Sequence, residues 1–177
     1  KVKVWGDHAL FCRPEMKTER CSYDVMTPSA ARGILDAIFW HPGLKWKIDQ
    51  IYVNHPIQFT SIRRNEVKSK ASASNALQVY NGSQKPLYIS SKEDIVRRLK
   101  RGQCYHTPYF GTREFPVRFC LCEEEEIHTA YEEQEEKDLG YMIWDMDYSD
   151  PENIQPMFFR AVLKRGVLDL RDCEVVR

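Results

Sequence analysis

The sequence lacks several features that would place a protein in a familiar class at once. Its apolar runs fall well short of the roughly 20 residues that a transmembrane helix needs, and no signal-peptide apolar region opens the chain. The six cysteines form no C-x-x-C pair, and no four-ligand spacing of a zinc site is present. We therefore expect a cytoplasmic protein with reduced thiols, no membrane partner, no metal and no cofactor.

The chain also lacks net charge, but this neutrality conceals two halves of opposite sign. Residues 1–118 contain twenty Lys and Arg against ten Asp and Glu, a net charge of +10, and residues 119–177 carry −10. Aromatic residues are interleaved with the basic ones. This combination is typical of a surface that holds a polyanion. It suggests a basic nucleic-acid-binding domain over 1–118 and a smaller region with an acidic loop over 119–177.

Hydrophobic periodicity indicates the first elements. Residues 1–11 alternate enough to predict a strand, and Thr27, followed by proline, is a suitable N-cap for a helix that His41-Pro42-Gly43 ends. Strands are then predicted over 44–53 and 57–60. The order strand, helix, strand, strand is the first half of a ferredoxin-like unit, which also underlies many RNA-binding domains.

The second half predicts one basic helix and a small antiparallel β-rich part. The helix places Ile95 and Leu99 on its apolar side, and strands are predicted over 141–146, 157–163 and 167–170, with a turn at Lys164-Arg165-Gly166. Asp145 and Asp147 share a strand face, but no histidine or third acid accompanies them to make a metal site. The fold class predicted is α+β, with a ferredoxin-like (RAMP/RRM-like) N-terminal domain.

A series of long blocks resembles a CRISPR-associated protein family. The blocks, in chain order, are Val4-Trp5-Gly6-Asp7, Arg13 to Lys17, Ser22 to Leu35, Ile62 to Val67, Arg97-Arg98, Gly102-Gln103, Gly111 to Pro116 and Asp138 to Met142. They are similar to the Cas-five family of the RAMP superfamily, type I-C (Dvulg) subtype, over nearly the whole chain. Long ordered blocks are far more specific than any short motif.

The resemblance implies a function. Family members cut precursor CRISPR RNA at the base of each repeat hairpin without a metal, and then stay on the 5′ handle within the type I-C Cascade complex. The implied partners are therefore the repeat hairpin and 5′ handle, the backbone and large subunits of Cascade, and, indirectly, target DNA. Two alternatives stay open: a non-catalytic subunit that caps the 5′ handle, and a generic module that binds single-stranded RNA.

Metal-free RNA cleavage needs a base near the 2′-hydroxyl, a cation near the phosphorane and an acid near the leaving oxygen. In the family, a ring residue at the end of the first helix works with a Lys-His pair from a later segment. Here Phe39 stands in the ring position and cannot move a proton, and the Lys-His pair is absent. Similar proteins carry a long insert with that pair where Ser90–Glu93 alone joins Ile89 to Asp94. Either the chain has lost this element or residues are missing from the sequence there. A ferredoxin-like sheet without this strand would have an open edge with unpaired backbone groups, which favours missing residues.

Three residues are candidates for the proton transfers. His106 follows the basic helix, and either acid–base catalysis or an ordinary surface position suits it. His41 lies two residues from Phe39, although a histidine at a helix end also suits the helix dipole. Lys92 is the lysine nearest the expected pair, although a solvated lysine fits the same pattern.

The expected RNA contacts are basic and aromatic side chains spread over four segments. Arginine and lysine bind phosphate, and an aromatic ring stacks on an unpaired base; a charged loop or a solvated helix face is the alternative for each group. The predicted RNA-binding residues are Arg13, Lys17, Arg20 and Tyr23 in the first loop; Arg63, Arg64 and Asn65 at a strand end; Arg97, Arg98 and Arg101 on the basic helix; and Arg113 beside Gly111.

Overall fold

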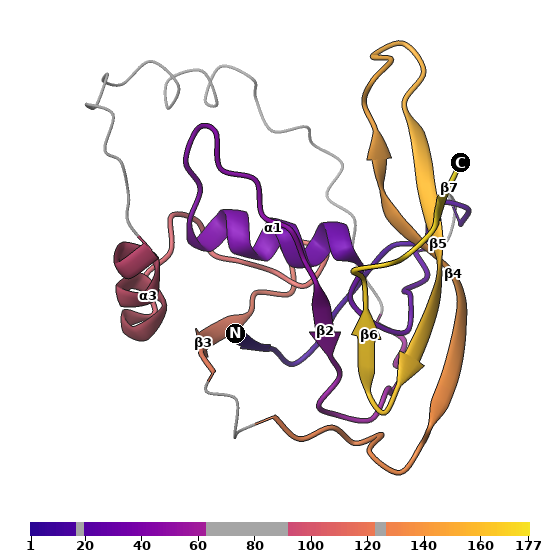
Figure 1. Cartoon of the computed structure of the whole chain (residues 1–177), viewed down its shortest axis with the longest axis horizontal. Helices are drawn as coiled ribbons and strands as arrows, with labels where there is room; N and C mark the ends of the chain where they lie inside the picture. The colour runs from indigo at the N-terminus through magenta and orange to yellow at the C-terminus, as the bar shows by residue number, and fades with distance from the viewer. Residues whose placement is uncertain (17–19, 63–91, 123–126) are drawn as a thin grey trace.

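The computed structural model describes residues 1–16, 20–62, 92–122 and 127–177 (Figure 1). Two helices and seven strands are named within them, in the order β1 (Val2–Trp5), α1 (Pro28–Ile38), β2 (Gln50–Tyr52), α3 (Lys92–Arg101), β3 (Arg118–Leu121), β4 (Glu136–Asp147), β5 (Gln155–Lys164), β6 (Val167–Asp169) and β7 (Val175–Val176). None of the helices described is long and apolar enough to cross a membrane.

The strands form two antiparallel sheets. β1 pairs with β3, with Val2 opposite Leu121, and the larger sheet has the order β2-β6-β5-β4, with β7 also paired to β5. Helices combined with antiparallel sheets confirm the α+β class. The ferredoxin-like arrangement stays a prediction, because the long segment between Ile62 and α3 lies outside the described residues.

The N-cap predicted for α1 is confirmed. Thr27 is extended, and its Oγ1 accepts a hydrogen bond of 3.2 Å from the Ala30 amide, while Pro28 occupies the first turn. Ala31, Ile34 and Ile38 recur at helical spacing and are buried. The helix ends at Ile38, and the Phe39 amide donates to the Leu35 carbonyl.

Three strand predictions in the first half were wrong in extent. β1 ends at Trp5 instead of reaching residue 11, and residues 57–60 form no strand. The strand predicted over 44–53 is reduced to Gln50–Tyr52. Leu44 and Trp46 instead pack in the cluster at the end of α1, where the Trp46 indole donates to the Phe39 carbonyl at 3.0 Å. β2 then pairs with β6 of the large sheet.

The strands predicted in the second half are confirmed, and β4 and β5 form a long hairpin that stands at one side of the molecule (Figure 1). The predicted β5–β6 turn has positive φ at Arg165 (47°) and Gly166 (78°). A side chain at Gly166 would meet the Thr129 hydroxyl at 2.2 Å, so the close approach of residue 129 requires glycine there.

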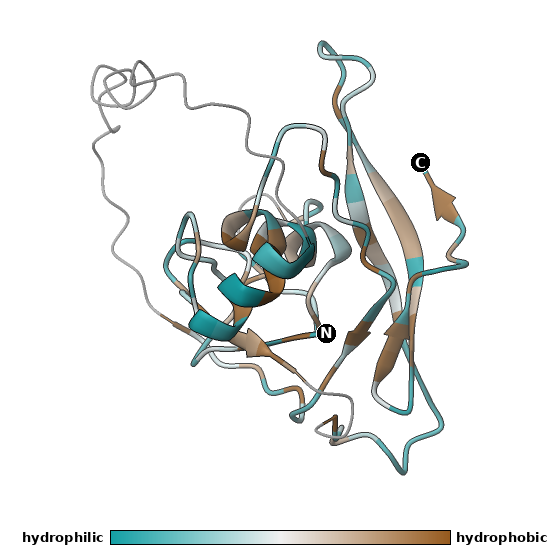
Figure 2. Ribbon diagram, turned by 60° about the vertical axis from the view of Figure 1, so that its left-hand side comes forward, coloured by the Kyte–Doolittle hydropathy of each residue, from teal (hydrophilic) through white to brown (hydrophobic). Residues whose placement is uncertain are grey.

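The hydrophobic core consists of two clusters that share α1. One cluster surrounds Phe159 and Leu163 of β5 and includes Phe11 and Ala31; the other joins Ile34, Ile38 and Phe39 to Leu99 of α3. The apolar sides of the helices and strands turn inward, and α3 keeps a hydrophilic outer side (Figure 2). Residues from both sides of the predicted domain boundary at 118/119 thus contribute to one core cluster. The boundary itself stays a prediction.

Candidate nucleic-acid interface

An open groove lies between α1 and the loop that follows α3. Its volume is about 960 Å³. Four of its residues, spaced three and four apart, form one stripe along α1 and its end, and the rest come from the loop. The lining residues are Gly33, Asp36, Ala37, Trp40, Tyr105, His106, Thr107, Pro108, Tyr109, Arg113 and Pro116. We call this feature the α1–loop groove.

Backbone hydrogen bonds hold the loop against the helix. The amides of Tyr105 and His106 both donate to the Ala37 carbonyl at 3.0 Å, which accepts them at the open end of α1. Farther along, Gly111 has a φ of +77°, and a Cβ there would lie 2.0 Å from the Leu10 carbonyl oxygen. Only glycine fits this approach, so the loop is fixed at both ends and His106 and Arg113 face the same groove.

The groove combines stacking surfaces with ionisable groups. Trp40, Tyr105 and Tyr109 remain 55%, 50% and 38% exposed. His106 and Arg113 supply a proton-transfer group and a fixed cation. Burial raises the pKa of Asp36, while the nearby positive charge of Arg32 works against that rise. Such a surface can stack on a base, bind a phosphate and exchange a proton in one place.

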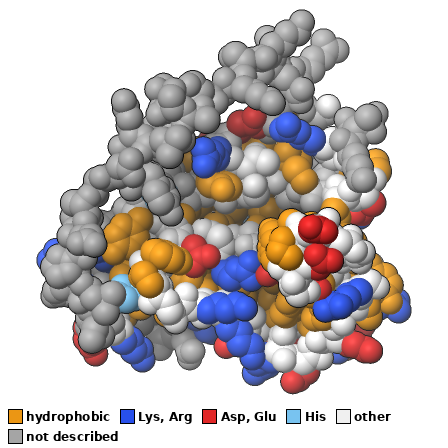
Figure 3. Space-filling model, turned by 90° about the horizontal axis from the view of Figure 1, so that it is seen from above, with side chains coloured by type: hydrophobic (Ala, Val, Ile, Leu, Met, Phe, Trp, Pro, Cys, Tyr) orange, Lys and Arg blue, Asp and Glu red, His pale blue; other side chains and the backbone are white. Residues whose placement is uncertain are grey.

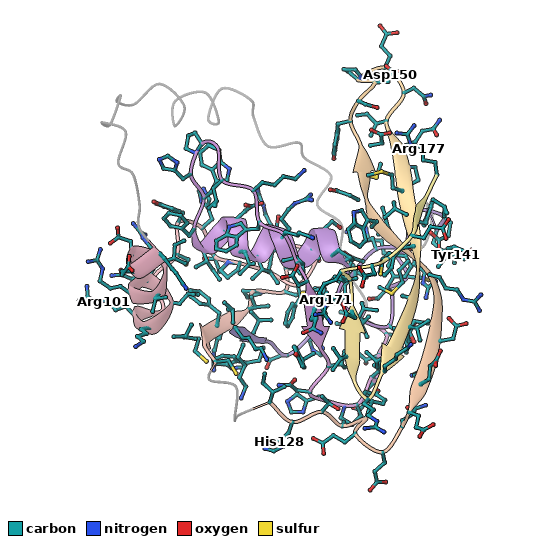
Figure 4. All side chains as sticks on the ribbon, viewed as in Figure 1. Arg101, His128, Tyr141, Asp150, Arg171 and Arg177 are labelled. Atoms are coloured by element: carbon teal, nitrogen blue, oxygen red, sulfur yellow. The ribbon has the colours of Figure 1, made fainter. Side chains whose placement is uncertain are left out.

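The basic helix α3 adjoins the groove through a cation–π contact. The Arg98 guanidinium lies 4.7 Å from the centre of the Tyr105 ring and 5.8 Å from that of Phe39. On the outer side of α3, Arg97, Lys100 and Arg101 surround a shallow concavity of about 480 Å³. Arg101 points away from the body of the protein (Figure 4), and basic side chains gather among hydrophobic ones on the face seen from above (Figure 3).

The structure brings some predicted site residues together and separates others. His106, Arg113 and Arg98 lie at the groove or beside it, and Lys92, Arg97 and Arg101 lie on the outer side of α3. The His41 Nδ1 is 2.7 Å from the Pro42 carbonyl oxygen, and this histidine does not line the groove. Four predicted residues lie outside the described part of the chain: Lys17, Arg63, Arg64 and Asn65.

The first-loop prediction fits the structure poorly. Tyr23 is only 2% exposed and belongs to the core, so its ring offers no face to a base. Arg13 lies over that ring at 4.5 Å and pairs with Asp24 at 3.4 Å and Glu15 at 3.7 Å. These contacts give Arg13 a structural role here. Arg20 is exposed in the same loop.

Asp36, Trp40 and Tyr109 are groove residues that sequence reasoning missed. A signal existed for the first two, because Gly33, Asp36, Ala37 and Trp40 follow a helical i, i+3, i+4, i+7 spacing opposite the apolar face of α1. The carboxylates of β4 are engaged elsewhere: Asp145 binds Arg32 at 2.5 Å and Asp147 binds Arg177 at 2.8 Å. Within the described residues, no group of three His, Cys, Asp or Glu is placed to hold a metal.

Comparison with known proteins places this chain in a family. The family model described as "CRISPR-associated protein (Cas_Cas5)" matches residues 1–93 and 89–171. The chain belongs to the Cas5 family, type I-C. The resemblance inferred from the sequence blocks is thereby confirmed.

Two curated relatives of this Cas5 chain carry the same name, "CRISPR pre-crRNA endoribonuclease Cas5d". The protein of Mannheimia succiniciproducens is 38% identical over 216 aligned positions, which cover 96% of this chain and 93% of the relative. The Thermus thermophilus protein is 34% identical, with 96% and 90% covered. Since 216 exceeds the 177 residues of this chain, the relative has residues with no counterpart here. The family match divides at residues 89–93, where the missing insert was predicted.

Solved structures support the fold. A functionally uncharacterized protein from Streptococcus mutans superposes with a TM-score of 0.71 at 22% identity, covering 99% of this chain and 95% of its own. A "CRISPR-associated Protein" superposes with a TM-score of 0.70 at 23% identity and the same coverage. At identities of 22% and 23%, these two structures show that the fold is shared and nothing further.

Proposed function

We propose that this Cas5 protein cleaves precursor CRISPR RNA at the repeat hairpin by metal-independent attack of a 2′-hydroxyl, and then stays on the 5′ handle in type I-C Cascade. The names of both curated relatives support the cleavage. The observation that carries the proposal for this chain is the α1–loop groove, where His106 and Arg113 occur together beside exposed aromatic rings and the basic helix α3.

The residue types in the groove suit this reaction. The 2′-oxygen attacks the adjacent phosphorus and the bond to the 5′-oxygen breaks, leaving a 2′,3′-cyclic phosphate and a 5′-hydroxyl. His106 takes the proton of the 2′-hydroxyl or returns one to the leaving oxygen, and Arg113 stabilises the charge on the phosphorane. The outer side of α3 binds phosphates of the hairpin, because its lysine and arginine side chains are exposed along one face.

A second function is favoured by a specific observation at Phe39. This residue stands where relatives are expected to have a proton-transferring ring, and it is 3% exposed, packed 6.0 Å from Tyr105. A buried phenylalanine gives the site no acid or base at that place. A protein that binds the 5′ handle and bridges the other Cascade subunits, without cutting, would need only the basic and stacking surfaces.

A cleavage assay separates the two functions. Purified protein is incubated with end-labelled repeat RNA in excess EDTA, and the products are resolved next to a phosphatase-treated sample. The nuclease predicts a single cut with a 2′,3′-cyclic phosphate end that resists phosphatase. RNA that is bound but stays intact would establish the handle-binding function instead, and cleavage only after addition of a divalent metal would contradict the proposed mechanism.

A further inference from the structure

Glycine 33 occupies a position that packing does not explain. It lies inside α1, where glycine is less favourable than alanine because its backbone loses more conformational freedom on folding. Its φ is not positive, and a Cβ built there would meet no atom of the described structure within 4 Å. The missing side chain instead widens the α1–loop groove, which Gly33 lines. At Gly33 the wall of the groove carries no side chain, so a ligand could approach the helix backbone there.

The side chains that line the groove could contact both the base and the phosphate of one nucleotide. Trp40 and Tyr109 offer exposed rings for stacking on a base, and Arg113 offers a cation for its phosphate. Asp36 lies one helical turn from both Gly33 and Trp40, on the same wall. The volume of about 960 Å³ is ample for a single nucleotide.

Asp36 is an unusual residue to line a groove that binds RNA, because a carboxylate repels phosphate. In the described part of the chain it makes no hydrogen bond or ion pair, since the neighbouring Arg32 donates to Asp145. Asp36 is half-buried and lines the groove, so its carboxylate oxygens remain available as acceptors for a ligand. A base is the part of RNA that supplies N–H donors to such a group.

We propose that the α1–loop groove binds one unstacked guanosine of the RNA and that Asp36 reads its Watson–Crick edge. This inference rests on RNA being the ligand, as in the proposed function. Guanine alone presents two adjacent donors on that edge, N1–H and N2–H₂, which match the two oxygens of a carboxylate. Adenine and cytosine each place an acceptor nitrogen beside their amino group, and uracil flanks its single N–H with two carbonyl oxygens; these acceptors repel a carboxylate.

Short oligonucleotides test this proposal without cleavage. We would measure, by fluorescence anisotropy, the affinity of the full chain for labelled hexauridylate and for the same oligonucleotide with one central G, A or C. A bidentate contact to the right base predicts that the G-containing oligonucleotide binds about 10-fold more tightly than the others. The Asp36→Asn variant should lose that preference, because its amide places a donor opposite a guanine donor, while its affinity for hexauridylate is kept or increased.

A second variant tests the place of binding. Gly33→Leu fills the groove from a helix position with free space around it, so it should weaken all four oligonucleotides alike while the fold is retained by circular dichroism. The proposal is overturned if wild-type protein shows no preference for G, if Asp36→Asn keeps it, or if Gly33→Leu binds normally. Guanine selectivity without cleavage of repeat RNA would remove the nuclease function and leave this inference standing; cleavage without selectivity would do the reverse.

Discussion

At the scale of single residues, the proposed cleavage needs another group to transfer the proton, because the ring of Phe39 carries no acid or base. Among the three candidates proposed from the sequence, only His106 lines the groove together with a fixed cation, Arg113. His41 contacts the Pro42 carbonyl oxygen, and Lys92 lies at the first position of α3, on its outer side. His106 is therefore the candidate that we propose to test first as the proton-transfer group.

We predict that His106→Ala lowers the single-turnover rate of repeat-RNA cleavage by about 100-fold or more, the contribution typical of a positioned acid or base. RNA affinity, measured by gel shift on the same samples, should change less than twofold, because the phosphate contacts remain. His128→Ala is the matched control, since His128 is exposed and lies at the bottom of the view, apart from α3 (Figure 4). Equal rates for His106→Ala and the control would exclude His106 from the chemistry.

At the scale of elements, a segment could be predicted from the sequence when residues within the same turn determine its structure, and could not when distant contacts do. Thr27 and Pro28 specify the start of α1 within one turn, and the β5–β6 turn is specified by Gly166. The strand predicted over 44–53 failed because the contact of Trp46 with the Phe39 carbonyl is tertiary and leaves no periodic signal. Asp36 is a different case: its helical spacing could be read from the sequence, but the loop packed opposite, which makes that helix face a groove wall, could not.

The helix α3 is the element that gives the protein its basic outer face. Leu99 fixes it on α1, and Lys100 and Arg101 extend from its last turn into solvent. We predict that the double change Lys100→Gln and Arg101→Gln weakens binding of the repeat hairpin at 150 mM salt. The slope of log affinity against log salt should fall by about 1–2, as two phosphate contacts are lost.

The control for α3 removes two charges elsewhere. Lys164→Gln with Arg165→Gln alters an exposed basic pair at the β5–β6 turn, at the other side of the molecule from α3 (Figure 1). If the salt slope falls equally in both double variants, the effect comes from net charge, and α3 is not the specific RNA contact.

At the scale of the whole molecule, α1 connects the α1–loop groove to the large sheet. One face of the helix contributes to both hydrophobic clusters, and the opposite face forms the wall of the groove. Between them Arg32 binds Asp145 of β4 at 2.5 Å, and both side chains are partly shielded from solvent. This ion pair joins a residue of the basic half, Arg32, to a residue of the acidic half, Asp145, where the helix meets the sheet.

This ion pair makes stability depend on pH in a definite direction. Burial of Asp145 raises the pKa of its carboxyl, but the hydrogen bonds from Arg32 and from the Met146 amide outweigh burial, and the net shift is downward. A carboxyl whose pKa is lower in the folded state stabilises the fold above its unfolded pKa of about 3.9. That contribution is lost as the pH falls through the folded pKa.

We therefore predict that Asp145→Asn lowers the free energy of unfolding by about 1 kcal/mol at pH 7, a value that allows for the partial exposure of the pair. The difference from wild type should shrink at pH 3, which lies below the unfolded pKa of about 3.9. Urea denaturation at both pH values measures it, and Asp7→Asn, in the exposed loop after β1, is the control with an expected change within 0.5 kcal/mol in size. A loss of the same size at both pH values would mean that the charge of the Asp145 carboxylate does not cause the stabilisation.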